Sequence, residues 1–243
     1  MLDNDTVTAD TFFSGRLRVH QARSGYRFSI DAVLLANAVQ PKAGQSVIDL
    51  GTGCGIIPLI LSFRFPGIYI HGVEVQQELA DLANLNVQAN GLQDWIRVIH
   101  KDVRRLTHED TDGTADWVVA NPPYRRALSG RINPNSQKAL ARHEIALDLP
   151  QLIQTTKRVL KTRGRFVMIY PADRMSDVFA HMRAAAIEPK WLQGIYSREG
   201  EAAKLFLVQG VNAGRPGLTL ASPVVVYQKD GTYTPAVQAM FQG

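Results

Sequence analysis

Short apolar runs alternate with stretches of helical pattern along most of this chain. Runs with the composition of buried strands lie at residues 46–50, 68–74, 96–100, 116–120, 165–170 and 203–211. Stretches with apolar residues every three or four positions lie at 56–65, 77–90, 149–161 and 173–186. Strands that alternate with helices form parallel sheets covered on both faces. The pattern therefore predicts an α/β fold with a doubly wound, mostly parallel sheet.

Two segments fall outside this alternation. Residues 12–26 are expected to form a small hairpin, which leads into a helix at 28–36 that Ser29 can cap. Residues 125–144 are polar and contain turn signals. A loop of this length in a compact domain is typically a lid, a binding loop or a disordered segment.

Nothing in the chain marks a boundary between domains, because it has neither an internal repeat nor a low-complexity linker. We expect one domain over residues 1–243, with an N-terminal extension at 12–40 and a Rossmann-like core at 41–243. Residues 212–217 are expected to form a turn inside the last hairpin.

The composition excludes several classes of protein. Hydrophobic residues make up 45% and charged residues 20%, which is ordinary for a soluble globular chain. No apolar stretch reaches the roughly 20 residues needed to cross a bilayer, and the acidic N-terminus lacks the pattern of an export signal. Cys54 is the single cysteine, so an internal disulfide and a cysteine-cluster metal site are excluded. We expect a cytoplasmic protein without a metal, in which Cys54 is a small buried filler.

A glycine turn follows the strand at 46–50. Gly51, Gly53 and Gly55 have the spacing G-x-G-x-G, which allows a sharp turn and the close approach of a ligand. The dinucleotide fingerprint G-x-G-x-x-G would instead place its third glycine at Ile56. This spacing favours a nucleotide-like cofactor over a nicotinamide-dependent reductase.

Three carboxylates lie at or near the ends of the predicted strands. Glu74, 23 positions after Gly51, ends the second strand, where it can accept both hydroxyls of a ribose. Asp102 follows the third strand and can accept a hydrogen bond from an adenine amino group, or cap the next turn. Asp49 can accept hydrogen bonds from the amides of the glycine turn. Because parallel strands place their carboxyl ends at one edge, we expect the glycine turn, Glu74 and Asp102 to meet around a cofactor, whereas such bonds give Asp49 a structural role.

The sequence Asn121-Pro122-Pro123-Tyr124 follows the buried-looking run 117–120. The Asn121 side-chain oxygen and the Pro122 carbonyl can accept the two protons of a planar amino group, and Pro123 stiffens the turn. Tyr124 can stack on the ring, a contact worth roughly 1–3 kcal/mol. Asn-Pro is also a common turn starter. Together with the glycine turn, the motif predicts methyl transfer to a nitrogen.

Basic residues indicate a polyanionic partner. The net charge is +5 and the isoelectric point about 9.4. Lysines and arginines gather at 16–27, at 97–105 and at 125–142. The first two groups are typical of a solvated surface, whereas the third follows the proposed reaction site directly. We expect that third group to bind nucleic acid.

These motifs resemble those of Rossmann-like, S-adenosylmethionine-dependent class I methyltransferases. The chain is most similar to bacterial enzymes that methylate the 6-amino group of an adenosine beside the anticodon of a valine tRNA. The resemblance spans about residues 12–207, has no matched motif after Gly210, and rests on the segments 26–36, 49–55, 72–74, 121–124 and 141–144. It implies a seven-stranded sheet with a short N-terminal hairpin and helix, and RNA as the partner.

The resemblance also implies roles for individual residues. The implied cofactor-binding residues are Phe28, Ser29, Asp31, Asp49, Gly51, Gly53, Glu74, Asp102 and Asn121. The implied catalytic residues are Asn121, Pro122 and Tyr124. The implied substrate-binding residues are Tyr124, Arg125, Arg126, Arg142 and His143. His143 is equally consistent with a surface position.

Other functions share the same motifs. A glutamine side chain of a release factor offers the same planar amide as an adenine, and a ribosomal RNA or DNA base is a further alternative substrate. The basic groups favour nucleic acid over protein. A module that binds RNA without turnover would also keep this fold.

Overall fold

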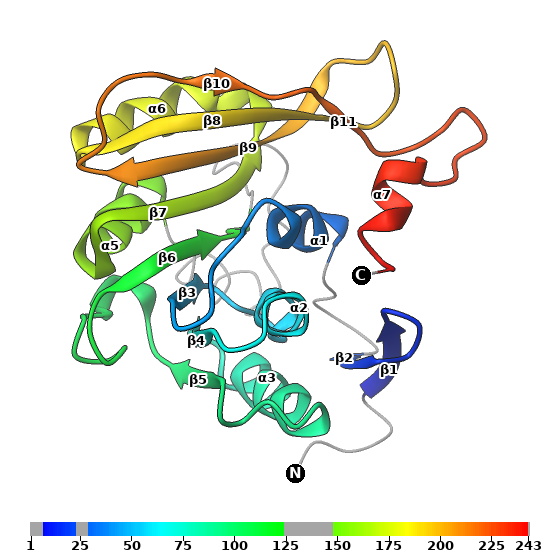
Figure 1. Cartoon of the computed structure of the whole chain (residues 1–243), viewed down its shortest axis with the longest axis vertical. Coiled ribbons are helices and arrows are strands. Elements are labelled where there is room, and N and C mark those ends of the chain that lie inside the picture. Colours follow the sequence, from blue (N-terminus) through cyan, green and yellow to red (C-terminus); the bar gives the residue numbers. More distant parts are fainter. Residues whose placement is uncertain (1–6, 23–28, 124–147, 243) are drawn as a thin grey trace, which may run out of the picture.

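A computed structural model of the chain describes residues 7–22, 29–123 and 148–242. Its centre is a sheet in which nine strands are described, seven long ones and two of two residues (Figure 1). The strands are β3 (Ser46–Leu50), β4 (Tyr69–Glu74), β5 (Ile96–His100), β6 (Ala115–Ala120), β7 (Leu160–Pro171), β8 (Ile187–Tyr196), β9 (Ala203–Asn212), β10 (Thr219–Leu220) and β11 (Val224–Val225). The long strands lie in the order β8-β9-β7-β6-β3-β4-β5. β9 is antiparallel to both its neighbours, whereas the pairs from β7 to β5 are parallel.

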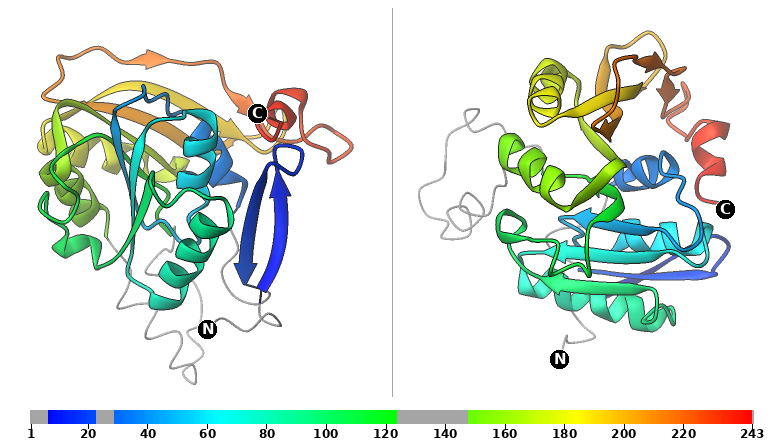
Figure 2. Two further views of the ribbon diagram at one scale, coloured as in Figure 1. Left: turned by 60° about the horizontal axis from the view of Figure 1, so that its bottom comes forward. Right: turned by 60° about the vertical axis from the view of Figure 1, so that its left-hand side comes forward.

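Helices cover both faces of the sheet (Figure 2). One core contains side chains of α1 (Ile30–Asn37), α2 (Ile56–Arg64) and α3 (Gln77–Ala89). The other contains side chains of α5 (Leu149–Val159) and α6 (Met175–Ala184). Successive strand residues alternate between the two cores, as the period of a strand requires. Val47, Trp117 and Val119 face the first core, and Ile48 and Val118 face the second.

The predicted strands and helices are largely confirmed. The strands at 46–50 and 96–100 have the predicted bounds, and α2 and α3 begin at the predicted residues 56 and 77. The helix predicted at 149–161 ends at Val159, because β7 already begins at Leu160. The helix predicted at 173–186 begins two residues later, after the short 3-10 helix η3 (Ala172–Arg174).

The N-terminal hairpin lies earlier in the chain than predicted. It pairs β1 (Val7–Phe12) with β2 (Leu17–Ala22). Phe13, Ser14 and Gly15 have φ values of 52°, 56° and 83°, so the chain reverses at the start of the segment predicted to form the hairpin. Residues 23–28 and 124–147, which include the predicted loop at 125–144, lie outside the described residues.

The sequence pattern did not predict β8, and it predicted the wrong structure for the segment that follows β9. β8 contains Pro189 and Gly194 and mixes buried with half-buried side chains, so its local pattern is weak. Because β8 pairs with β9, the last hairpin closes at residues 197–202. The prediction of a hairpin turn at 212–217 is therefore wrong. That stretch leads instead to β10, which lies on the other side of β8 and runs parallel to it.

The C-terminal segment packs against the tip of the hairpin (Figure 2). It includes the short helix α7 (Pro235–Ala239). The amide of Phe13 donates a 3.2 Å hydrogen bond to the carbonyl of Phe241. Phe241 also stacks on Phe12 and on Tyr233, with ring centroids 5.7 and 5.5 Å apart. Phe13 stacks on Phe63 of α2 at 4.4 Å, so the hairpin belongs to the first core. The division into segments 12–40 and 41–243 stays a prediction.

None of the described helices is long and apolar enough to cross a bilayer.

Candidate active site

The glycine turn and the Asn-Pro-Pro motif lie at the ends of neighbouring parallel strands. β3 and β6 pair with Leu50 opposite Ala120, so Gly51 and Asn121 leave the sheet side by side at its carboxyl edge. β4 flanks β3 on the other side, with Val73 opposite Leu50. Ligands of open parallel sheets bind at this edge. The register therefore brings the predicted cofactor and acceptor segments together.

The backbone of the glycine turn is held by the next strand. The amides of Gly51 and Thr52 both donate 2.9 Å hydrogen bonds to the Val73 carbonyl. Gly51 and Gly53 have φ values of 82° and 57°, in the left-handed region that favours glycine. Gly55 begins α2 with φ 83°, and a Cβ there would lie 3.3 Å from the Cβ of Ala83 in α3. The glycines thus serve both the sharp turn and close helix packing.

Glu74 is buried at the end of β4 and organises this turn. Its Oε2 accepts a 2.9 Å hydrogen bond from the Gly53 amide, and its Oε1 accepts one of 2.9 Å from the Gln76 amide. Each carboxylate oxygen has a second lone pair available for a ligand. Binding of ribose hydroxyls by Glu74 stays a prediction.

Asp49 lies on β3 and is fully buried. Neither its carboxylate nor the buried Thr52 hydroxyl has a hydrogen-bond partner among the described residues. The expectation that Asp49 accepts hydrogen bonds from the turn amides is wrong, because Val73 and Glu74 take them. Burial raises the pKa of the Asp49 carboxyl to about 7; the neighbouring Thr52 hydroxyl opposes this shift and the charge of Glu74 adds to it. An unpaired buried carboxylate costs free energy unless a ligand supplies donors. The site therefore fits a cationic amino group.

Two residues that the sequence analysis left without a role support the turn. Gly72 lies opposite Asp49 on β4, and a Cβ there would come within 2.9 Å of the Thr52 hydroxyl. A glycine inside a buried strand is the signal that could have shown this close approach. Asn86 is fully buried, donates a 2.8 Å hydrogen bond to the Cys54 carbonyl and accepts one of 2.6 Å from the His20 amide. It ties the glycine turn to β2.

Cys54 has the predicted character of a buried filler. Its side chain is 2% exposed, and burial raises the pKa of its thiol to about 12. A thiol with such a pKa is a poor nucleophile at neutral pH. Among the described residues, no group of three or more His, Cys, Asp or Glu side chains is arranged to hold a metal ion.

Asp102 caps the 3-10 helix η2 (Val103–Arg105) directly after β5. Its Oδ1 accepts a 2.9 Å hydrogen bond from the Arg104 amide, and its Oδ2 lies 2.6 Å from the Arg104 guanidinium. The hydrogen bond to Arg104 holds the pKa of Asp102 below its usual value. The capping alternative is thus realised, and the contact with an adenine amino group stays a prediction.

The structure describes some of the other predicted site residues and leaves six of them outside its described segments. Asn121 is half-buried and Pro122 is buried. Ser29 occupies the N-cap position of α1 without forming the expected side-chain cap. Burial raises the pKa of Asp31, and its interaction with the Ser29 hydroxyl opposes that shift. Six predicted site residues lie outside the described part of the chain: Phe28, Tyr124, Arg125, Arg126, Arg142 and His143.

Known proteins are similar to this chain in sequence and in fold. The methyltransferase small domain family matches residues 24–191. A tRNA1(Val) (adenine(37)-N6)-methyltransferase of Porphyromonas gingivalis is 34% identical over 178 residues, covering 71% of this chain and 69% of that protein. A protein of the same name from Tolumonas auensis is 24% identical, covering 95% of this chain and 94% of that protein. A predicted O-methyltransferase of Agrobacterium tumefaciens has the same fold, with a TM-score of 0.68 at 21% identity, covering 86% and 94%.

The sheet order, the glycine turn and these matches define an S-adenosylmethionine-dependent class I methyltransferase. More narrowly, the chain belongs to the methyltransferase small domain family, together with the curated tRNA1(Val) (adenine(37)-N6)-methyltransferases. The predicted fold class and the predicted family are confirmed.

Proposed function

We propose that the protein transfers a methyl group from S-adenosylmethionine to the 6-amino group of an adenosine in tRNA(Val), in the anticodon loop. The observation that carries the proposal is the register of β3 and β6, which sets Gly51 beside Asn121. A donor held by the glycine turn and a base held by the Asn-Pro oxygens would then face each other across one strand spacing, about 4.8 Å.

The donor side of the site is built from buried carboxylates. Asp49 and the Thr52 hydroxyl would accept hydrogen bonds from the cationic amino group of the donor, since both lack partners among the described residues. Glu74 would accept the ribose hydroxyls with its remaining lone pairs. The bound donor supplies an electron-poor methyl group on a sulfonium, which leaves as a neutral thioether.

The acceptor side orients a weak nucleophile. The lone pair of an exocyclic amine is delocalised into the adenine ring. The Asn121 side-chain oxygen and the Pro122 carbonyl would accept its two protons and return electron density to nitrogen as the new bond forms. One proton is then lost to water. Because alignment supplies most of the acceleration, the site needs no strong base.

The proposed substrate rests on the relatives and on charge. The curated relatives are named for adenine 37 of tRNA1(Val). A base in an anticodon loop is unpaired, so little energy is needed to turn it into a pocket. The net charge of +5 suits a polyanion. A tRNA substrate also implies that the enzyme works in the cytoplasm.

The direct test is a methylation assay on an unmodified tRNA(Val) transcript, with nucleoside analysis by mass spectrometry. We expect N6-methyladenosine to appear with wild-type protein and to be absent with Asn121→Ala. A ribosomal RNA, a DNA duplex and a release factor are assayed in parallel. Methylation of one of these instead would change the substrate and keep the chemistry. Binding of RNA without any methyl transfer would identify a non-catalytic module.

A further inference from the structure

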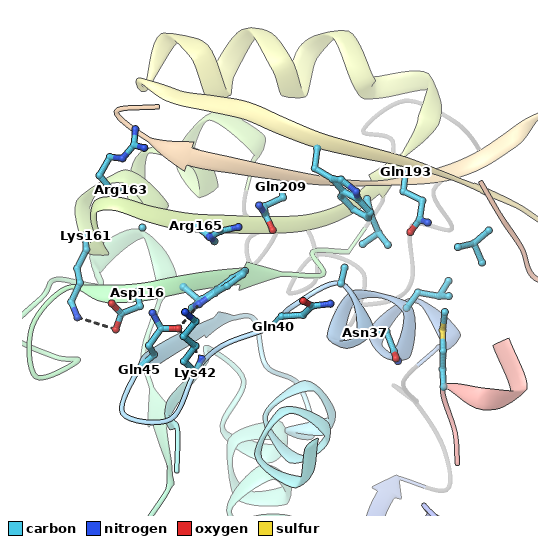
Figure 3. A pocket seen from close by; sticks show the side chains of 18 of the residues that line it. Asn37, Gln40, Lys42, Gln45, Asp116, Lys161, Arg163, Arg165, Gln193 and Gln209 are labelled. Carbon is cyan, nitrogen blue, oxygen red and sulfur yellow. Dashed lines mark hydrogen bonds and ion pairs between the residues drawn. The ribbon is translucent and has the colours of Figure 1, made fainter. Parts of the chain in front are cut away.

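A large groove with polar and apolar lining runs along the α1 face of the sheet, from the edge opposite the candidate active site to β8 and the C-terminal segment (Figure 3). It has a volume of about 930 Å³ and lies where β6 and β7 begin, beside the C-terminal end of α1. Gln45, directly before β3, lines the groove, whereas Gly51 follows β3 at the other edge. Six residues of strand separate them by about 20 Å. The end of the groove at Gln45, where the basic residues lie, is therefore distinct from the proposed site of methyl transfer.

The groove is strongly basic. Lys42, Lys161, Arg163 and Arg165 line it, and Asp116 is the single carboxylate among its lining residues. Asp116 is engaged by Lys161 at 2.9 Å. Lys42, Arg163 and Arg165 have no carboxylate within ion-pair distance among the described residues, so three cations are left for a ligand.

The fold holds the Arg165 side chain by a contact and sets the backbone of Arg163 by a bulge. The Arg165 guanidinium lies 5.3 Å from the centre of the Trp117 ring, and the Trp117 indole nitrogen donates a 3.1 Å hydrogen bond to Gln45. Arg163 lies in a bulge of β7, where the four residues between Leu160 and Arg165 lie opposite a single residue of β6. Its φ is 67°, an unfavourable conformation for a residue that is not glycine. Such outliers persist where the surrounding structure holds them, often at functional sites.

The rest of the lining suits nucleotides. Gln45, Gln193 and Gln209 present side-chain amides, which both donate and accept hydrogen bonds as base edges and riboses do (Figure 3). The Gln45 oxygen already accepts from Trp117 and the Gln193 amide donates to the Ser222 carbonyl, which leaves the Gln45 amide donors and the Gln193 oxygen for a ligand. Trp191 is half-exposed in the same groove and offers a ring for stacking. An acidic peptide would use the cations and leave the amides and the ring without a role.

We propose that this groove binds a second segment of the substrate RNA, gripping phosphates with Arg163 and Arg165 and a base with Trp191. The inference rests on the proposed function, because it assigns the groove to the RNA that is methylated at the other edge. An RNA that contacts both edges spans the sheet. The groove then supplies affinity and register while the base enters the active site.

The test compares two double variants with wild-type protein. Arg163→Asn with Arg165→Gln removes both cations; asparagine tolerates the left-handed conformation, so the bulge is kept. The control is Arg97→Gln with Arg183→Gln, which removes two exposed arginines outside the groove. Exposed ion pairs of this kind contribute little to stability. Thermal unfolding verifies that both variants fold, and calorimetry with S-adenosylhomocysteine measures their donor site.

Affinity for a tRNA(Val) transcript is then measured from 50 to 200 mM salt. We expect the groove variant to bind about tenfold more weakly, with a slope of log affinity against log salt that is smaller by about 1.4, or 0.7 for each lost phosphate contact. The control variant should bind the transcript with the wild-type affinity and salt slope. Both variants should bind S-adenosylhomocysteine with the wild-type affinity. If the groove variant had the same salt slope as the control variant, the inference would be overturned.

The outcomes separate this inference from the proposed function. If wild-type protein methylates the transcript and the groove variant binds it with an unchanged slope, the groove inference fails alone. If no RNA is methylated but the groove variant still loses affinity and slope, the proposed function fails alone. Groove-dependent binding of a polyglutamate peptide, without groove-dependent binding of RNA, would assign the surface to an acidic protein and overturn the inference.

Discussion

The amide of Gly53 donates a 2.9 Å hydrogen bond to the carboxylate of Glu74, which lies 21 residues further along the chain. The second oxygen of the same carboxylate accepts the amide of Gln76. One buried side chain thus joins the glycine turn to the end of β4. This geometry couples the shape of the turn to the position of the proposed ribose acceptor.

Replacing Glu74 should weaken donor binding and the fold together. Glu74→Ala leaves two amides without their acceptor, and each unsatisfied buried group costs about 1–3 kcal/mol. Glu74→Gln can accept only one of the two amides, because its NH2 group faces the other. We expect at least roughly tenfold weaker binding of S-adenosylhomocysteine in both variants, consistent with the loss of one hydrogen bond to a charged group. An unaltered calorimetric affinity would remove Glu74 from the donor site.

Asn121→Ala should leave donor binding almost unchanged and lower turnover by roughly 100–1,000-fold, or about 2.7–4 kcal/mol. The reason is that Asn121 would act on the amino group only as the new bond forms. Turnover is measured on the tRNA transcript under single-turnover conditions. Near-wild-type turnover would show that another group accepts the amine protons.

The contribution of Asp49 to the stability of the ligand-free protein should fall as the pH rises from about 4 to 7. The unfolded Asp49 carboxyl loses its proton near pH 3.8, whereas the folded one keeps it to about pH 7. Across this window the Asp49 carboxyl holds more protons in the folded state than in the unfolded state, so its contribution to stability decreases with pH, by up to about 4 kcal/mol. Asp49→Asn should flatten this part of the profile. Urea unfolding between pH 4 and 7 measures it, and identical slopes for variant and wild type would contradict the assignment.

Donor binding should release a proton near pH 6. A cationic amino group beside Asp49 favours the ionised carboxylate, which lowers its pKa from about 7. Calorimetric titration with S-adenosylhomocysteine in two buffers of different ionisation enthalpy counts the released protons. Asp49→Asn is the control, since it has no proton to lose. Equal enthalpies in both buffers for wild type would exclude the proposed contact.

Cys54 should resist thiol reagents in the native protein. A pKa of about 12 leaves on the order of one thiolate in 10,000 at pH 8, and the side chain is 2% exposed. Iodoacetamide should label the protein only in urea. Because Cys54 lies inside the glycine turn, S-adenosylhomocysteine should slow any residual labelling further. Rapid labelling of the folded chain would mean that the turn opens readily.

Local patterns were sufficient for the parts of the fold that local physics decides. The strands at 46–50 and 96–100 are short apolar runs, and the glycine turn needs backbone angles that glycine adopts most easily. The meeting of Gly51 and Asn121 also followed from the sequence, because parallel strands share one carboxyl edge. The site residues outside the described segments stay predictions.

Contacts between distant segments decided the rest. β8 has a weak pattern of its own and exists because β9 pairs with it. Asp49 was expected to bond the turn amides, but the carbonyl of Val73 and the carboxylate of Glu74 take them, which leaves Asp49 buried and unpaired. The basic groove joins Lys42 and Arg165, more than a hundred residues apart. Burial, register and the choice among competing partners depend on which segments meet, and that is a property of the folded chain.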